Sequence, residues 1–273
     1  MTKNVFFLVL AALLSACGGG GADLAPIVTT VRAQSLRYGQ TAVINVAGNF
    51  LRFDMVADTG SCANPVFSAS SSPNLATLNC KVTATGPLPI TIRAANGEVL
   101  HAATFTVLPP QVTLVTSKGN VVMELLPDVV PTTVNNFLSY IGSGYYQNTL
   151  FHRVIAGFVV QGGGYTTGLI KKSGQASPIA LESNKGLSNS RGTVAMARTN
   201  VPDSATSEFF VNQVDNLSLN YASVASPGYA VFGRVVQGLD VVDAIAAVPT
   251  STFNGTRDVP ATDVTITFAV QTQ

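Results

Sequence analysis

Short stretches of alternating apolar and polar residues dominate the first part of the chain. The pattern is clearest at residues 42–46 (AVINV), 90–94 (ITIRA) and 104–107 (TFTV). A two-residue period is typical of a β-strand with one buried face, and the Asn-Gly pair within residues 95–98 is typical of a hairpin turn. Short strands at this spacing predict a small immunoglobulin-like β-sandwich over residues 25–108.

A different pattern follows Pro109 and Pro110. Proline lacks the N–H that a β-ladder requires, so the pair predicts a domain boundary. Residues 112–116 and 121–125 alternate and flank a turn, which predicts two hairpin strands. Residues 264–268 alternate in the same way and predict a closing strand. The second region is therefore expected to have strands at both of its ends.

Two stretches of the second region have helical periodicity. Within residues 131–141, apolar side chains recur at positions i, i+3, i+4 and i+7, which is the spacing of one helix face. Pro131 suits the first turn of a helix, and Gly142 favours its end. Residues 239–247 predict a second helix. A mostly β region with one early and one late helix is compatible with a closed barrel plugged at each end.

The beginning of the chain has the pattern of a secretory signal. A lysine precedes an apolar run at residues 5–16, which is too short to cross a hydrocarbon core of ~30 Å. The Leu-Ser-Ala-Cys segment that ends at Cys17 resembles a bacterial lipobox, which implies a signal peptide at residues 1–16, a diacylglycerol on Cys17 and a flexible tether at residues 17–24. An ordinary signal peptide with an incidental cysteine is the alternative.

The lipobox interpretation predicts a location in the bacterial cell envelope. Gly18 stands where lipoproteins retained in the inner membrane have Asp, which favours the outer membrane, with the protein facing the periplasm. With Cys17 lipidated, Cys62 and Cys80 remain as a pair, and in an oxidising compartment they would form a disulfide. Two free buried thiols are the alternative.

Composition excludes several classes of protein. The 273 residues include 15 Lys and Arg against 14 Asp and Glu, a formal charge of +1, so there is no basic surface for nucleic acid. The charged fraction of 11% and the hydrophobic fraction of 47% differ from those of disordered chains. Two histidines and three cysteines are too few for a Cys/His zinc cluster. No metal or other cofactor is expected.

The common catalytic motifs are also absent. The sequence has neither a phosphate-binding loop nor an H-E-x-x-H pattern, and no helix pattern follows the glycines at residues 162–164. His152 is the only histidine of the second region, and no nucleophile-elbow sequence accompanies it. We therefore interpret His152 as a hydrogen-bonded structural residue.

Three ordered blocks do stand out. They are residues 151–164 (FHRVIAGFVVQGGG), residues 196–198 (MAR) with 204–211 (SATSEFFV), and residues 229–233 (YAVFG). With these blocks, residues 111–273 resemble a cyclophilin, a peptidyl-prolyl cis-trans isomerase, most closely of the bacterial periplasmic kind. The resemblance implies an eight-stranded antiparallel barrel capped by two helices, so the whole chain would be mainly β.

The resemblance also implies which residues act. Arg153, of the Phe-His-Arg run, would donate hydrogen bonds to the prolyl nitrogen of a twisted Xaa-Pro bond without a covalent intermediate, and Gln161 would orient it. Phe158 would complete the catalytic set and contribute to the proline pocket. The other residues expected to bind substrate, through side chains or main chain, are Val159, Ala197, Arg198, Glu208, Phe210, Leu219 and Tyr229.

The chain departs from the family pattern at two positions that affect these expectations. Glu208 stands where a Gln is usual, and Ser218 stands where a Trp or Phe is found. The loss of the large apolar side chain at Ser218 predicts weak cyclosporin binding. The main hypothesis is a monomeric isomerase acting on proline-containing segments of envelope proteins. The alternative is a catalytically weak lipoprotein that binds such segments as a chaperone or docking module. A third interpretation is an adhesin that acts through its sandwich.

Overall fold

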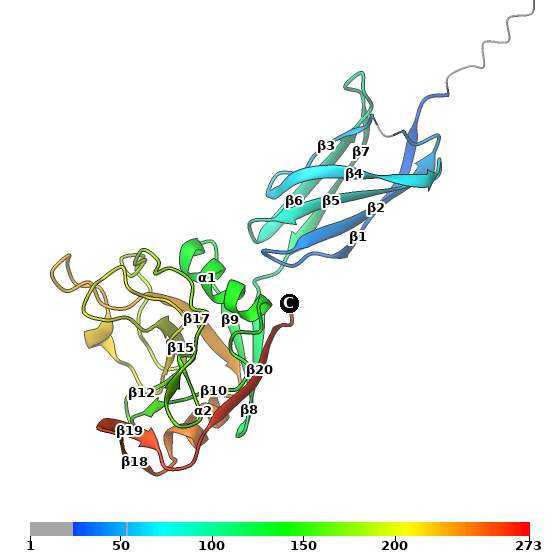
Figure 1. The fold of residues 1–273 in the computed structure, drawn as a ribbon. Helices are drawn as coiled ribbons and strands as arrows, with labels where there is room; N and C mark the ends of the chain where they lie inside the picture. Colours follow the sequence, from blue (N-terminus) through cyan, green and yellow to red (C-terminus); the bar gives the residue numbers. More distant parts are fainter. Residues whose placement is uncertain (1–23, 53) are drawn as a thin grey trace, which may run out of the picture.

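The computed structural model describes residues 24–52 and 54–273 (Figure 1). The signal peptide predicted at residues 1–16 and the lipid anchor predicted at Cys17 lie outside the described residues. Within the described part of the chain, no helix has the length and apolar character needed to cross a membrane.

The first module consists of a four-stranded sheet in the order β1-β2-β5-β4 and a three-stranded sheet in the order β3-β6-β7. Their bounds are β1 (Ile27–Ser35), β2 (Thr41–Asn49), β3 (Val56–Asp58), β4 (Cys62–Ser72), β5 (Leu75–Val82), β6 (Gly86–Arg93) and β7 (Val99–Val107). Side chains from both sheets, among them Ile44, Leu78 and Ile90, enclose one apolar core. The alternating segments of the sequence therefore form strands with one buried face, and the immunoglobulin-like topology stays a prediction.

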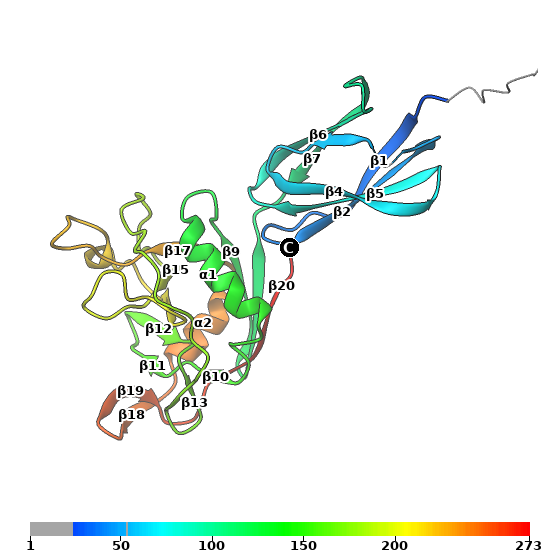
Figure 2. The same ribbon diagram turned by 45° about the horizontal axis from the view of Figure 1, so that its top comes forward.

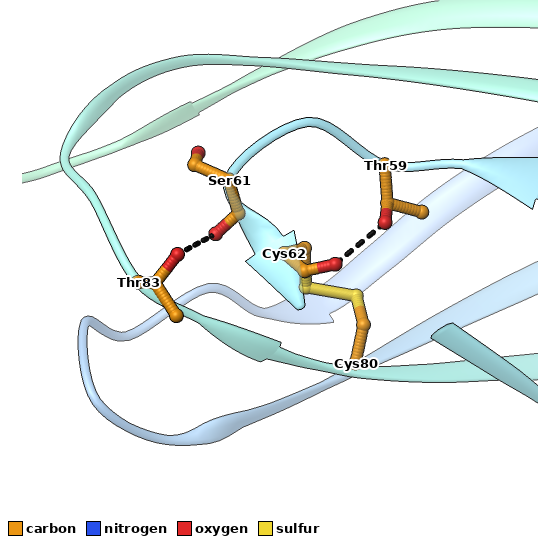
Figure 3. The surroundings of a disulfide bond; sticks show 5 residues. All are labelled: Thr59, Ser61, Cys62, Cys80 and Thr83. Carbon is orange, nitrogen blue, oxygen red and sulfur yellow. Dashed lines mark hydrogen bonds between the residues drawn. A yellow bond between two sulfur atoms is a disulfide. The ribbon is translucent and has the colours of Figure 1, made fainter. Parts of the chain in front are cut away.

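A disulfide between Cys62 and Cys80 connects the adjacent strands β4 and β5 (Figure 3). The two Cα atoms are 5.3 Å apart, and both side chains are buried. At a sequence separation of 18, closing the loop stabilises the fold by about 3 kcal/mol in the chain-entropy model. Next to it, the Thr59 hydroxyl donates to the carbonyl of Cys62, and the Thr83 hydroxyl donates to the carbonyl of Ser61.

The second module begins after Pro110, at the predicted boundary. One long antiparallel sheet runs in the order β10-β20-β8-β9-β17-β15-β16-β12-β11. The bounds are β8 (Gln111–Thr116), β9 (Gly119–Leu125), β10 (Thr149–Leu150), β11 (Arg153–Val154), β12 (Val159–Gly162), β15 (Thr193–Met196), β16 (Phe209–Asn212), β17 (Val231–Gln237) and β20 (Thr265–Gln271). Two hairpins lie outside this sheet: β13 (Tyr165–Thr166) with β14 (Ile170–Lys171), and β18 (Thr250–Phe253) with β19 (Thr256–Pro260).

The long sheet closes on itself through one interrupted strand. The segment 149–154 pairs with β20 at its start and with β12 at its end, so β10 and β11 occupy the two edges although they are consecutive in the chain. Phe151 and His152, both buried, separate the two pieces. Counted as one strand, the segment gives the eight strands that the resemblance implies, and the mainly β fold is confirmed.

Two helices contribute to the barrel core, α1 (Pro131–Gly142) and α2 (Leu239–Ala246). Phe137 of α1 and Ile245 of α2 are fully buried in the same cluster as the inward side chains of the sheet. A residue remote in the chain supplies a hydrogen-bond acceptor to the first turn of α1: the Glu182 carboxylate accepts from the N–H of Thr133 at 2.8 Å. Both helices agree with the predicted ranges to within one residue.

The two modules meet at the turn between β1 and β2. Tyr38 from this turn is buried in the cluster that fills the barrel, and its carbonyl accepts a hydrogen bond from Gln271 at 3.1 Å. Gln40 donates to the same Gln271 side chain at 2.8 Å. The C-terminus accordingly lies beside the first module in both views (Figures 1 and 2).

Candidate active site

A cavity of about 380 Å³ opens on the outside of the barrel. It is lined by the side of the sheet formed by β12, β15 and β16 and by the loop that includes the short 3₁₀ helix η1 (Leu217–Leu219). The lining residues are Arg153, Phe158, Val159, Gln161, Ala197, Arg198, Phe210, Leu219 and Tyr229. The structure thus brings together every residue that the sequence proposed for catalysis or substrate contact except Glu208.

Strand alternation places the two faces of β16 in different environments. Phe209 points into the barrel, where it belongs to the main core, whereas its neighbour Phe210 belongs to a small apolar cluster outside it. On β12, Val160 belongs to the main core inside the barrel and Val159 to the small apolar cluster outside it. Because successive side chains of a strand point to opposite faces, the sheet forms both the barrel core and the floor of the cavity.

Arg153 and Gln161 lie directly opposite each other in the pairing of β11 with β12. Their side chains share a face for this reason, and the Arg153 guanidinium donates from Nη1 to the Oε1 atom of Gln161 at 3.2 Å. Both side chains are half-buried. An arginine keeps its charge and offers several N–H donors in a planar fork, so Arg153 gives the cavity a cationic donor beside apolar walls.

Tyr229 and Arg198 form another side of the cavity. The Tyr229 ring meets the Phe210 ring edge-on at a centroid distance of 5.5 Å, and the Arg198 guanidinium lies 4.7 Å from the Tyr229 centroid. Arg198 also donates from Nε and Nη2 to the carbonyl of Gly228 at 2.9 and 2.8 Å. The Arg198 side chain thus covers Tyr229, a cation–π contact that residue order alone does not reveal.

A group of buried asparagines holds the loop that carries Leu219. Asn212 of β16 donates to Asn189, and Asn216 donates to Asn212 at 2.8 Å. The N–H of Asn189 in turn donates to the side chain of Asn220, next to Leu219. The sequence did not predict this network, because Asn212, Asn216 and Asn220 recur every four residues without forming an α-helix, and Asn189 lies on a different segment. Ser218 does not line the cavity.

Glu208 occupies a different place from the one expected. It is absent from the cavity lining, because its carboxylate turns toward His152 and Gln161. Oε2 of Glu208 lies 3.3 Å from Nε2 of His152 and accepts from Nε2 of Gln161 at 3.0 Å. Burial raises the pKa of Glu208, but its hydrogen bonds and electrostatic interactions with His152, Gln161 and Lys171 outweigh burial and hold the pKa below its ordinary value.

His152 is buried and contacts Glu208 rather than the cavity. Its ring also packs against the ring of Tyr165 at a centroid distance of 4.6 Å. Among residues 24–52 and 54–273, no group of three or more His, Cys, Asp or Glu side chains could hold a metal ion. The polar side chains that Arg153 and Gln161 bring to the cavity are a guanidinium and an amide, beside an apolar slot.

Residues 111–270 match the family model described as cyclophilin type peptidyl-prolyl cis-trans isomerase/CLD. Over 157 residues the chain is 50% identical to peptidyl-prolyl cis-trans isomerase B of Escherichia coli, covering 57% of this chain and 95% of that protein. It is 52% identical over 157 residues to the isomerase cyp18 of Streptomyces antibioticus, covering 57% and 94%.

A solved structure is similar as well. It is a cyclophilin type isomerase of Cryptosporidium parvum, determined in the presence of the dipeptide Ala-Pro. The TM-score is 0.52 at 27% identity, and the match covers 60% of this chain and 99% of that one. The family model covers the second module, which contains the cavity.

Proposed function

The chain belongs to the cyclophilin-type peptidyl-prolyl cis-trans isomerase family, and from this premise we propose which residues catalyse the reaction and where the protein acts. It is an enzyme of the peptidyl-prolyl isomerase class. An Xaa-Pro bond exchanges between cis and trans in tens to hundreds of seconds without a catalyst, because rotation disrupts amide resonance at a cost of ~18–20 kcal/mol. A catalyst must therefore bind the twisted bond more tightly than either planar isomer.

The proline ring fits the apolar part of the cavity. Phe210 and Val159 form its floor and Leu219 one wall. With the ring held there, the Arg153 guanidinium lies at the edge of the same slot. In the twisted state the prolyl nitrogen becomes pyramidal and gains a lone pair, to which Arg153 donates. Because the nitrogen accepts poorly while the bond is planar, this hydrogen bond strengthens in the transition state and lowers the barrier.

The observation that carries this proposal is that one cavity contains both the fixed donor and the slot. Gln161 holds Arg153 at 3.2 Å, which limits the rotamers that the long side chain can adopt. Phe158 adds apolar surface beside it. Ala197 and Arg198 line the same cavity, and we assign their main chain to the residue before proline. No step requires a nucleophile, a metal or a cofactor.

Binding of the dipeptide Ala-Pro tests the location of the slot. Titrated into the full chain, it is expected to shift the NMR resonances of Phe210, Leu219 and Tyr229, and to inhibit isomerisation of a proline tetrapeptide competitively. Gly-Ala is the matched control, since it lacks the ring that the slot accommodates. Shifts confined to other regions, or no inhibition, would contradict the proposed slot.

Truncation of one wall tests the contribution of the slot to substrate binding. Leu219→Ala removes apolar contact from the proline ring, so kcat/KM is expected to fall about 3–10-fold, mainly through a higher KM. Leu217→Ala is the matched control, because Leu217 lies on the same short helix, is 60% exposed and is absent from the lining. Equal effects of the two substitutions, measured by steady-state assays, would contradict the assignment.

The alternative of a catalytically weak binding module loses part of its support. It rested on a carboxylate at residue 208 close to the substrate and on Ser218 in place of a large apolar residue, whereas Glu208 lies outside the cavity lining. The slot also keeps Arg153 beside its apolar walls, which a module that only holds proline segments does not need. The position of Arg153 therefore favours an isomerase over a module that only binds proline segments.

We further propose that the protein acts on exported polypeptides in the cell envelope, as a monomer anchored through a lipid on Cys17. The support comes from the lipobox-like end of the apolar run and from the disulfide between Cys62 and Cys80, which is typical of oxidising compartments. Mass spectrometry of the protein purified from membranes should find a chain that begins with diacylated Cys17. A chain that retains residues 1–16, or one cut after Cys17, would contradict the anchor.

A further inference from the structure

A chain of hydrogen bonds extends from the cavity to a half-buried carboxylate. Arg153 donates to Oε1 of Gln161, Nε2 of Gln161 donates to Oε2 of Glu208, and Nε2 of His152 lies 3.3 Å from the same oxygen. Oε2 of Glu208 thus contacts both the amide nitrogen of Gln161 and a ring nitrogen of His152. Only the first two members of this chain line the cavity.

The chemistry of the end groups determines the orientation of the amide between them. A guanidinium has donors only, and an ionised carboxylate has acceptors only. Gln161 satisfies both neighbours in one orientation, with its oxygen toward Arg153 and its NH₂ toward Glu208. A reversed amide would place NH₂ against the guanidinium and oxygen against the carboxylate, and would lose both hydrogen bonds.

The surroundings of Glu208 fix the carboxylate itself. A Cβ atom on Gly164 would lie 2.6 Å from the Glu208 side chain, so only glycine leaves room for it there. The Glu208 side chain is 23% exposed, and its other neighbour, His152, is held against Tyr165. Nδ1 of His152 is buried without a hydrogen-bond partner among the described residues, so Nε2 is the ring nitrogen that faces Glu208.

We propose that Glu208 is a positioning residue of this isomerase: its acceptor-only carboxylate, held by His152, locks the Gln161 amide so that the amide oxygen faces and fixes Arg153. Glu208 acts through Gln161 and does not touch substrate. The inference rests on the proposed role of Arg153, and it gives the departure from the usual Gln at this position a function. A Gln at position 208 could also accept from Gln161, but it could equally donate, so it would not exclude the reversed amide.

Two substitutions at Glu208 test the proposal. Glu208→Met keeps similar volume but has no good acceptor, so Gln161 is released; kcat for a proline tetrapeptide is expected to fall roughly tenfold with KM nearly unchanged. Glu208→Gln restores an acceptor and is expected to stay within about threefold of wild type. Glu124→Gln is the control, because Glu124 also pairs with a side chain, Arg234, but neither residue lines the cavity.

A spectroscopic measurement tests the same lock without enzymatic activity. The side-chain NH₂ resonances of Gln161 are expected to be shifted downfield by hydrogen bonding in wild type and to move upfield in Glu208→Met, while those of Gln40, which donates to Gln271, stay in place. Unchanged Gln161 resonances would overturn the proposal.

The kinetic outcomes separate this inference from the proposed function. Wild-type kcat in Glu208→Met would overturn the positioning role while leaving Arg153 as the donor. A raised KM with unchanged kcat would also overturn it, because it would mean that Glu208 contacts substrate. If instead Arg153→Ala retains full activity, the proposed function fails, and the resonances of Gln161 still decide whether Glu208 locks the amide.

Discussion

Replacement of Arg153 with alanine is expected to lower kcat/KM for a proline tetrapeptide by about 10²–10³-fold, the usual effect of removing one preorganised donor to a transition state. Arg153 is the fixed cationic donor at the slot, held at 3.2 Å from Gln161. The loss should appear in kcat, because the slot that binds the proline ring stays intact and KM should change little. Since arginine stays charged, wild-type turnover is expected to vary little across roughly pH 6–9.

The matched control for this substitution is Arg234→Ala. Arg234 is also paired, with Glu124 at 2.7 Å, but on the exposed side of β17, so its loss should leave turnover unchanged. Circular dichroism of both variants should match wild type, because neither side chain belongs to a hydrophobic core. An Arg153→Ala variant that is folded and as active as the control would refute the role of the guanidinium.

The largest expected loss of stability comes from Phe137→Ala. Phe137 is fully buried, and its ring lies 5.2 Å from that of Tyr146, 5.5 Å from that of Phe209 and 4.9 Å from that of Phe232, between centroids. Removing it takes away the ring that α1 contributes to this cluster and leaves a cavity. The free energy of unfolding is therefore expected to fall by about 3–5 kcal/mol.

Urea denaturation followed by tyrosine fluorescence measures this change. The chain has no tryptophan, and all of its tyrosines except Tyr38 lie in the second module, so the signal reports mainly on the barrel. Phe253→Ala is the matched control, because Phe253 lies on β18 and is 42% exposed; its effect should stay within about 0.5 kcal/mol. Similar midpoints for the two variants would contradict the assignment of the core.

Periodicity predicted the helices and strands whose buried side chains recur at a regular spacing along the chain. The i, i+3, i+4, i+7 pattern after Pro131 predicted α1, and alternation predicted β2 and β8. It did not predict the division of residues 149–154 into β10 and β11, because the cause is the burial of Phe151 and His152 between two different partner strands. The hairpin of β18 and β19 was also missed, since most of its side chains are exposed and carry no apolar pattern.

The candidate site was likewise predicted in part from the sequence. The ordered blocks around Arg153, Ala197 and Phe210 predicted the cavity lining, because short motifs keep their positions on the strands. Glu208 was misplaced relative to the cavity, since its direction depends on His152 and Gln161, which lie on other segments of the fold. A long-range contact of this kind leaves no pattern in the local sequence, and neither does the support of α1 by Glu182.

The Arg153 guanidinium, beside the proline slot, is the group to which the acceleration of Xaa-Pro rotation is assigned. NMR exchange spectroscopy on a proline tetrapeptide tests this assignment directly, with the full chain at a small fraction of the peptide concentration. Wild type is expected to bring exchange from the uncatalysed tens to hundreds of seconds to below a second, whereas Arg153→Lys, which keeps the charge but not the planar fork, should leave exchange close to the uncatalysed rate. Slow exchange with wild type, or equally fast exchange with Arg153→Lys, would contradict the assignment.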